Sequence, residues 1–218
     1  MANRGQLHPE SEIRAAIAAE RREIAAVLDE LPGRAWDEPS LCTGWRVREV
    51  AAHMSLGFRY SFPKLAGELV KARGSLDRMT DRCARRDAAE FSTTQLAGFL
   101  RDNAHHPWKP PVGGIVAALG HDVVHGLDIT VPLDVDRRIP RDRLRMLLSA
   151  VDPKSVRFFG ARLDGVELRA TDLDWTFGAG APLSGSAQDL LLVTYGRKLP
   201  SGRLDGPDAG RFTLPKAN

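Results

Sequence analysis

Apolar residues recur every three to four positions along the first 130 residues, the spacing that places them on one face of an α-helix. Between residues 10 and 31 such an apolar stripe opposes a side rich in Arg and Glu, and it consists of Ile13, Ile17, Ile24, Val27 and Leu28. Pro32-Gly33 ends this predicted helix.

Further helical segments follow the first one. One begins near Trp45, with Thr43 as its expected N-cap. Residues 58–90 are charged and helical in pattern without clear ends. The remaining segments are a short helix over 91–103 capped by Ser92 and a helix from 114 to about 131. Together these segments predict a four-helix bundle, a fold that builds ligand sites from side chains on facing helices.

The pattern changes after residue 132, where an Asp- and Arg-rich linker is expected. Apolar residues then alternate with polar ones, which is typical of strands. In order, we expect a linker at 133–140, helices at 141–150 and 155–159, strands at 166–170 and 173–177, a loop at 178–185, a helix opening at Ser186 and a final edge strand near Phe212. The chain is therefore predicted to be α+β, with a helical bundle at 1–135 and a small α/β domain at 136–218.

Two histidines four residues apart, His121 and His125, lie on the predicted helix that begins at residue 114, so their rings project from the same face. That face otherwise carries small residues and Asp128, whereas the opposite face is apolar. His53 flanks the apolar stripe of another helix and supplies a third imidazole. Three neutral nitrogen ligands with an open fourth position are typical of a catalytic metal site. The alternative is that these histidines are polar helix residues without a ligand.

Asp128 has two interpretations. It is placed to accept the spare ring N–H of a metal-bound histidine, which would fix the tautomer of that ring. It could equally cap the end of the helix. Asp122 is expected to lie off the histidine face, and we see no general base beside the histidines in the sequence.

The other histidines and the cysteines give weaker signals. His105 and His106 precede a proline and are interpreted as loop residues at the mouth of a pocket, outside the metal site. Two cysteines, Cys42 and Cys83, indicate neither a disulfide framework nor a cysteine zinc site. Cys42 is expected to pack in its loop, although its place beside a helix start could lower its pKa.

Charge and composition exclude several classes of protein. The net charge is +3, and the basic residues are almost all Arg interleaved with acids, so nucleic-acid binding is not expected. No apolar run approaches the roughly 20 residues of a membrane span, and no signal peptide is recognised. We expect a cytoplasmic protein that acts on a small molecule, as a monomer or a homodimer.

Four stretches together resemble one family over nearly the whole chain. Residues 41–53, Leu-Cys-Thr-Gly-Trp-Arg-Val-Arg-Glu-Val-Ala-Ala-His, resemble a signature of the mycothiol-dependent maleylpyruvate isomerase family, which belongs to the DinB-like metal-binding bundles. Residues 121–128, His-Asp-Val-Val-His-Gly-Leu-Asp, resemble its second metal motif. Residues 166–175 and 184–192 resemble its small C-terminal domain, which is related in shape to sterol carrier domains.

The resemblance implies a function. It implies a DinB-like bundle in which His53, His121 and His125 bind a divalent metal, and mycothiol as a thiol cosubstrate that attacks a small electrophile in an isomerase or transferase reaction. The isomerase carries Glu where this chain has His121, which puts the particular reaction in doubt. An acidic substrate would require arginines nearby, for which the candidates are Arg59, Arg85 and Arg197.

Two alternatives use the same histidines. One is a hydrolase in which a metal-bound hydroxide is the nucleophile, and the other is a non-catalytic metal- or ligand-binding protein. Zinc is the expected metal for three imidazoles, although nickel, cobalt and iron also accept them.

Overall fold

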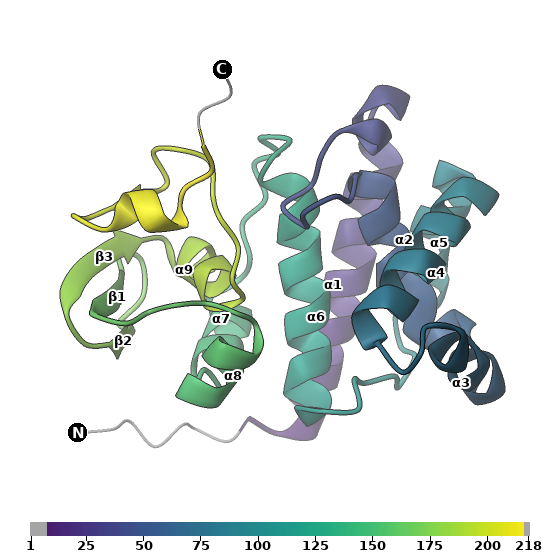
Figure 1. The fold of residues 1–218 in the computed structure, drawn as a ribbon, viewed down its shortest axis with the longest axis horizontal. Coiled ribbons are helices and arrows are strands. Elements are labelled where there is room, and N and C mark those ends of the chain that lie inside the picture. The colour runs from purple at the N-terminus through teal and green to yellow at the C-terminus, as the bar shows by residue number, and fades with distance from the viewer. Residues whose placement is uncertain (1–7, 216–218) are drawn as a thin grey trace. The chain divides into compact units, whose positions relative to one another are not determined.

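The structure is a computed structural model that describes residues 8–215. These residues divide into two compact units. The first unit comprises Pro9–Ile129 and is helical, and the second contains the chain from Thr130 onward and holds the sheet (Figure 1). Within residues 8–215, no helix combines the length and the apolar character needed to cross a membrane.

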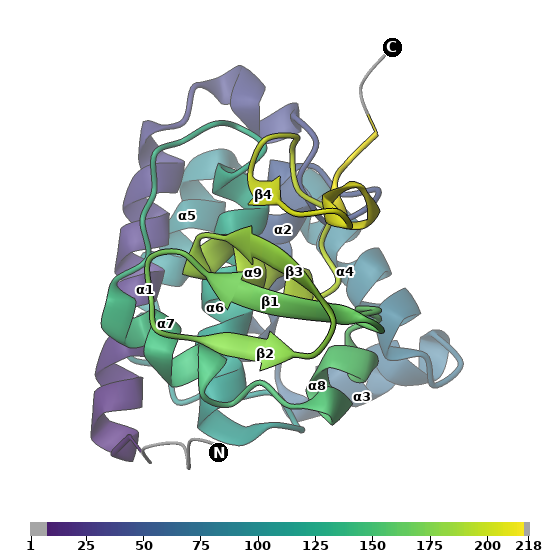
Figure 2. The ribbon, with the colours of Figure 1, turned by 90° about the vertical axis from the view of Figure 1, so that its left-hand side faces the viewer.

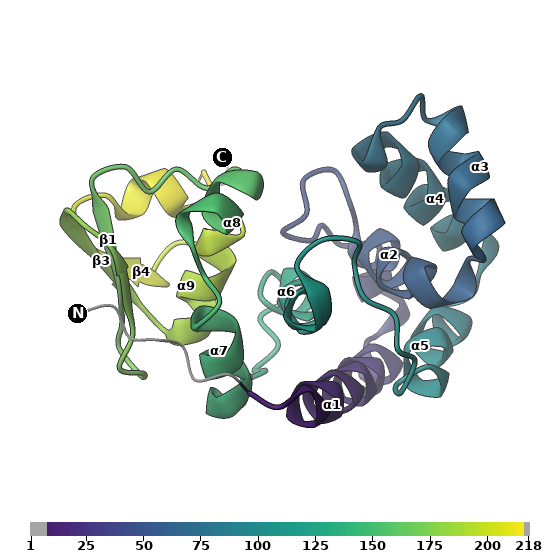
Figure 3. The same cartoon turned by 90° about the horizontal axis from the view of Figure 1, so that it is seen from below.

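The first unit is the helical bundle that the sequence predicts. Helix α2 packs against both α4 and α5, and α1 packs against α5, while α6 runs through the unit beside α1 and α2 (Figure 3). The helices are α1 (Glu10–Glu30), α2 (Val47–Arg59), α3 (Phe62–Lys71), α4 (Leu76–Glu90), α5 (Thr93–Asp102) and α6 (Gly114–Thr130), with a short 3-10 helix η1 (Gly33–Asp37).

The segment 58–90 resolves into two helices, α3 and α4, joined by a tight turn. Arg73 and Gly74 both adopt positive φ in that turn, at 54° and 76°. The side chains of this region meet in one apolar cluster, which consists of Leu56, Tyr60, Ala72, Met79 and Cys83 with Leu65 and Leu69 packed on it. The charged residues of the segment therefore cover a small core of their own.

Helix starts agree with the sequence in one case and differ in another. Ser92 caps α5 as expected, accepting a hydrogen bond from the backbone N–H of Gln95. The expected cap at Thr43 is wrong, because α2 begins at Val47 after a turn. At that start the Glu49 carboxylate accepts the backbone N–H of Arg46 at 2.8 Å. The carboxylate of Glu49, three residues after Arg46, thus bonds back to the backbone at the helix start, in place of the hydroxyl cap expected from Thr43.

The second unit places helices beside a four-stranded sheet (Figure 2). The strand order is β2-β1-β3-β4, with β1 and β3 parallel and the outer pairs antiparallel. Helix α9 packs against α7, β1 and β3. The elements are α7 (Arg141–Leu148), α8 (Pro153–Phe158), β1 (Val166–Ala170), β2 (Thr176–Gly178), β3 (Ala181–Gly185), α9 (Ala187–Thr194), β4 (Leu204–Asp205) and the 3-10 helix η2 (Ala209–Phe212).

Two expectations for the second unit are wrong. The loop expected at 178–185 contains strand β3, because its five residues pair in parallel with β1 and so gain hydrogen bonds that local sequence does not reveal. The edge strand expected near Phe212 is absent from the described residues; Phe212 ends η2, and β4 is formed earlier by residues 204–205. Only an isolated bridge joins Leu199 to Thr213.

Candidate metal centre

Three histidines from two helices meet inside the first unit. His53 comes from α2, and His121 and His125 come from successive turns of α6. One nitrogen of each ring lies within 4.8 Å of one nitrogen of the other two. The ring centroids are 4.8 to 5.2 Å apart, and all three side chains are half-buried. The spacing predicted from the sequence therefore does bring these three imidazoles together.

The separation of two of the ring nitrogens matches what one metal ion requires. Nε2 of His53 and Nε2 of His121 are 3.3 Å apart. Two nitrogens bound to zinc at 2.0–2.1 Å with a tetrahedral angle between them would be about 3.3–3.4 Å apart. The residues present therefore fit a tetrahedral ion that these rings share.

Two carboxylates contact the Nδ1 atoms of the two α6 histidines. His121 Nδ1 lies 2.9 Å from Asp122 Oδ1, and His125 Nδ1 lies 2.9 Å from Asp128 Oδ2. Because a carboxylate accepts but does not donate, each Nδ1 carries the proton and each Nε2 keeps its lone pair. This is the arrangement that orients metal-binding histidines in proteins.

Of the two carboxylates, only Asp128 was expected in this place. Asp122 does leave the histidine face, but its fully buried side chain reaches back to the ring of its neighbour His121. Asp122 therefore lies off the histidine face as expected, but its contact with His121 was not expected from the sequence. The helical wheel fails here because it treats side chains as radial, whereas a short carboxylate can bond to the adjacent residue.

Arg21 of α1 forms an ion pair with Asp122. The sequence did not predict a role for this residue. Its Nε donates to Asp122 Oδ2 at 2.7 Å, and both side chains are 0% exposed. Its Nη1 donates to the carbonyl oxygens of Asn103 and His106 at 3.1 and 2.9 Å. A detectable signal exists in the sequence, because Arg21 interrupts the apolar stripe between Ile17 and Ile24.

Cys42 joins the site through the second carboxylate. Its Sγ donates to Asp128 Oδ2 at 3.0 Å and lies 3.7 Å from His125 Nδ1. The loop that carries Cys42 is tied to α6, because the backbone N–H of Leu41 donates to the carbonyl of Asp128. Cys42 thus packs in its loop as expected, and its thiol also contacts the group that orients His125.

Two tryptophans border the histidines. The ring of Trp45 is centred 5.1 Å from that of His53, and the ring of Trp108 is centred 5.0 Å from that of His121. Trp108 lies directly on the backbone of α2 at Gly57, where a Cβ atom would fall 2.1–2.4 Å from atoms of the indole. Glycine at this position is therefore what allows the indole to reach His121.

Replacing Gly57 with alanine is expected to displace Trp108 and to cost about 1–3 kcal/mol of the free energy of unfolding through overpacking. The matched control is Gly67→Ala in the exposed part of α3, where a Cβ meets nothing within 4 Å. That change should stabilise the protein by up to about 1 kcal/mol through helix propensity. Urea unfolding and tryptophan emission of both variants measure the effect, and equal behaviour would show that Trp108 does not lie on Gly57.

The remaining loop histidines lie outside the group of three. His105 contacts the guanidinium of Arg22, and His106 Nδ1 accepts the backbone N–H of Trp108. Burial, followed by the charge of Arg21, lowers the pKa of His106. Both histidines line a cavity of about 370 Å³ together with Trp108, as the interpretation of a pocket mouth suggested.

The three candidate arginines lie in different surroundings. Arg59 is held by Asp87 and by Ser55 Oγ, and it stacks over Phe99. Arg85 is exposed, and it pairs with Asp81 and donates to the carbonyl of Gly44, two residues from Cys42.

Arg197 belongs to the second unit, where it follows α9 and donates to the carbonyl of Tyr195. The structure does not gather the three arginines around one point within either unit.

The chain forms a helical bundle in which three histidines from facing helices come together, and a small α/β unit follows the bundle. In class it is thus an α+β protein with a candidate metal centre in its bundle. Residues 17–107 match the sequence family described as the mycothiol maleylpyruvate isomerase N-terminal domain, so this segment is similar to that family. Curated proteins offer no match to the sequence.

Two solved structures share the fold across both units. One is the crystal structure of the mycothiol-dependent maleylpyruvate isomerase, with a TM-score of 0.58 and 15% identity. The other is a histidine-to-alanine mutant described under the same enzyme name, with a TM-score of 0.59 and 14% identity. Each comparison covers 97% of this chain and 97% of the other chain. At this identity the likeness confirms the α+β fold expected from the sequence.

Proposed function

We propose that this protein is a metal-dependent enzyme that uses mycothiol to attack a small electrophilic substrate, as an isomerase or a transferase. The observation that carries the proposal is the convergence of three imidazoles, two of them oriented by carboxylates. The family of residues 17–107 and the names of the two structural neighbours support the choice of thiol.

His53, His121 and His125 would hold the metal. A bound divalent ion would supply Lewis acidity, which lowers the pKa of a thiol and favours its thiolate. Three neutral ligands leave the full +2 charge of such an ion at the centre, where a set of two histidines and a glutamate would leave +1. This donor set therefore suits an anionic sulfur ligand, and zinc is the metal we propose.

The surrounding residues orient and shield the site. Asp122 and Asp128 fix the ring planes and tautomers of His121 and His125. Trp45 and Trp108 exclude water from two sides of the histidines. Arg21 forms a buried ion pair with Asp122 within the bundle, and this contact holds the carboxylate that orients His121.

We keep Arg59, Arg85 and Arg197 as the candidates for binding a substrate carboxylate. The guanidinium of Arg59 is already committed to the buried Asp87, and that of Arg85 lies in an exposed pair with Asp81. Arg197 lies in the second unit, where it follows α9 and donates to the carbonyl of Tyr195. A guanidinium binds a carboxylate through two parallel hydrogen bonds, which suits an acidic electrophile.

The test is a comparison of thiols on the zinc-loaded protein. Turnover of maleylpyruvate and of a chlorinated aromatic electrophile should require mycothiol, and His125→Ala should abolish it while His105→Ala leaves it intact. Product analysis then separates isomerisation from transfer, because only transfer leaves sulfur in the product. Turnover without any thiol would contradict the proposal and favour the hydrolase. Metal binding without turnover on any substrate would favour the binding protein.

A further inference from the structure

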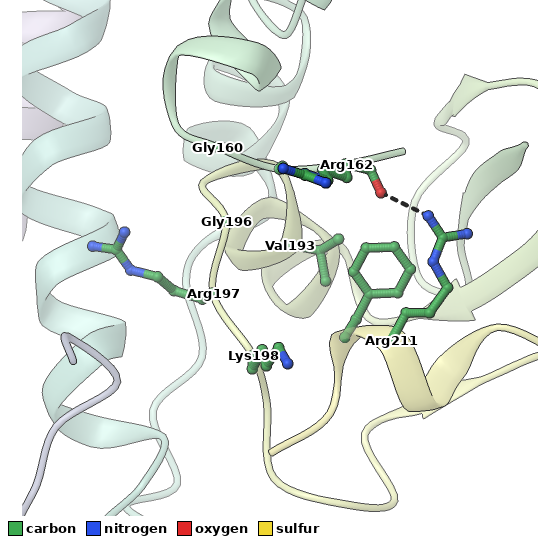
Figure 4. A pocket seen from close by; sticks show the side chains of 9 residues that line it. Gly160, Arg162, Val193, Gly196, Arg197, Lys198 and Arg211 are labelled. Carbon is green, nitrogen blue, oxygen red and sulfur yellow. Dashed lines mark hydrogen bonds between the residues drawn. The ribbon is translucent and has the colours of Figure 1, made fainter. Parts of the chain in front are cut away.

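A second candidate site lies in the α/β unit, at the point where α8, α9 and η2 end. It is a cavity of about 260 Å³ (Figure 4). Its lining combines cationic side chains with an apolar floor, and it consists of Gly160, Ala161, Arg162, Val193, Gly196, Arg197, Lys198, Arg211 and Phe212. The volume is slightly below the roughly 300–1,000 Å³ of pockets for drug-sized ligands, so it suits a smaller molecule.

Four cationic residues line this cavity, and three of them, Arg162, Lys198 and Arg211, have few carboxylate partners. Among the described residues, Arg162 and Lys198 have no ion pair, and Arg211 has one, with Asp208 at 3.4 Å. Like charges gathered at a concave surface repel one another and focus a positive potential into the concavity. Binding of an anion there would relieve that repulsion.

Arg211 is fixed in place by the backbone of the opposite wall. Its guanidinium donates to the carbonyl oxygens of Arg162 and Asp164, at 3.1 and 3.4 Å, and lies over the ring of Phe212. Figure 4 shows the bond to Arg162 crossing one side of the cavity. A guanidinium has five N–H donors, so donors remain for a ligand after these contacts. Little side-chain entropy would then be lost when the ligand binds.

The floor of the cavity is formed by apolar residues that are mostly buried. Val193 and Phe212 are 0% and 7% exposed. Gly196 turns the chain at the end of α9 with φ of 74°, and a Cβ there would fall 2.3 Å from the carbonyl oxygen of Phe159. This close approach places Lys198 beside the segment that carries Arg162. Of the two floor side chains only Phe212 presents apolar surface to the cavity, above the fully buried Val193, while the rim offers charge.

We propose that this cavity binds a small organic carboxylate with a short apolar body, through Arg162, Lys198 and Arg211. The fork of Arg211 suits a planar carboxylate, and the floor suits an aromatic ring or a short alkyl chain. Arg197 takes no part, because its side chain is turned away from Val193 and Arg211 (Figure 4). The site depends on neither the histidines nor a metal.

The test is an amide NMR titration of the full chain, without added metal, using benzoate as the probe. Benzoate should shift the resonances of Gly196, Lys198 and Phe212, and Lys198→Gln should raise the dissociation constant about tenfold. Arg211→Gln should raise it further. The matched control is Arg169→Gln, which removes an exposed arginine paired with Glu167 on β1 and should change nothing.

Two further probes sharpen the assignment. Benzyl alcohol should bind at least tenfold more weakly than benzoate, and inorganic phosphate, which lacks an apolar body, should also bind more weakly. Equal shifts with benzyl alcohol would overturn the role of the cations, and equal affinity for phosphate would overturn the carboxylate class. Absence of any shift at these three residues with benzoate would overturn the site itself. Because metal is absent, these outcomes are independent of the proposed thiol chemistry.

Discussion

Replacement of His125 with alanine is expected to remove the metal from this protein. One ring nitrogen of His125 lies within 4.8 Å of a ring nitrogen of His53 and of His121. Without His125, two imidazoles on separate helices would remain as ligands. Loss of an outer residue that merely orients a ligand already costs 10–100-fold in metal affinity, so loss of the ligand itself should cost more than about 100-fold. Elemental analysis after dialysis against a weak chelator measures this directly.

His105→Ala provides the control for that experiment. His105 is an exposed loop histidine bonded to Arg22 and lies outside the group of three. Its removal should leave one metal per chain, which also shows that loss of a histidine by itself does not change the metal content. Equal metal content in His125→Ala and the native protein would contradict the assignment.

Replacement of Arg21 with methionine is expected to cost about 3–5 kcal/mol of the free energy of unfolding. Arg21 and Asp122 are both fully buried, and their ion pair joins α1 to α6. Methionine fills much of the same volume but leaves the Asp122 carboxylate without its cation. An isolated buried charge is far more costly than a missing hydrogen bond, which is why this single change should have a large effect.

Two further variants separate the charge effect from packing. Arg14→Met removes an exposed arginine of the same helix, paired with Glu10, and should cost no more than about 1 kcal/mol. The double variant Arg21→Met with Asp122→Leu should recover part of the lost stability, because no charge is then left buried. Urea unfolding measures all three. If Arg21→Met costs no more than Arg14→Met, the buried ion pair does not support α6.

The candidate ligands could be predicted from the sequence because helical spacing alone places His121 and His125 on one face. The position of His53 followed from its place beside the apolar stripe of α2 and from the family signature at residues 41–53. The apolar stripe of α1 likewise predicted the buried faces of Ile13, Ile17, Ile24 and Leu28, which are 0–5% exposed. Local periodicity carries this information because a helix is stabilised within one segment.

The supporting contacts could not be predicted in the same way. Arg21 reaches Asp122 across 101 residues of sequence, and Cys42 reaches Asp128 across 86. Strand β3 depends on β1 for its hydrogen bonds, so the segment 178–185, which contains one proline and three glycines, gave no local sign of a strand. Each of these features arises when distant segments pack, and no pattern within one segment encodes that pairing.

The most direct test of the metal centre is X-ray absorption at the zinc edge of the zinc-loaded protein. We predict imidazole scattering from three ligands at about 2.0–2.1 Å, with a lighter fourth ligand that sulfur at about 2.3 Å replaces when mycothiol is added. A spectrum with fewer than three imidazoles, or one in which mycothiol brings no sulfur to the zinc, would contradict the account.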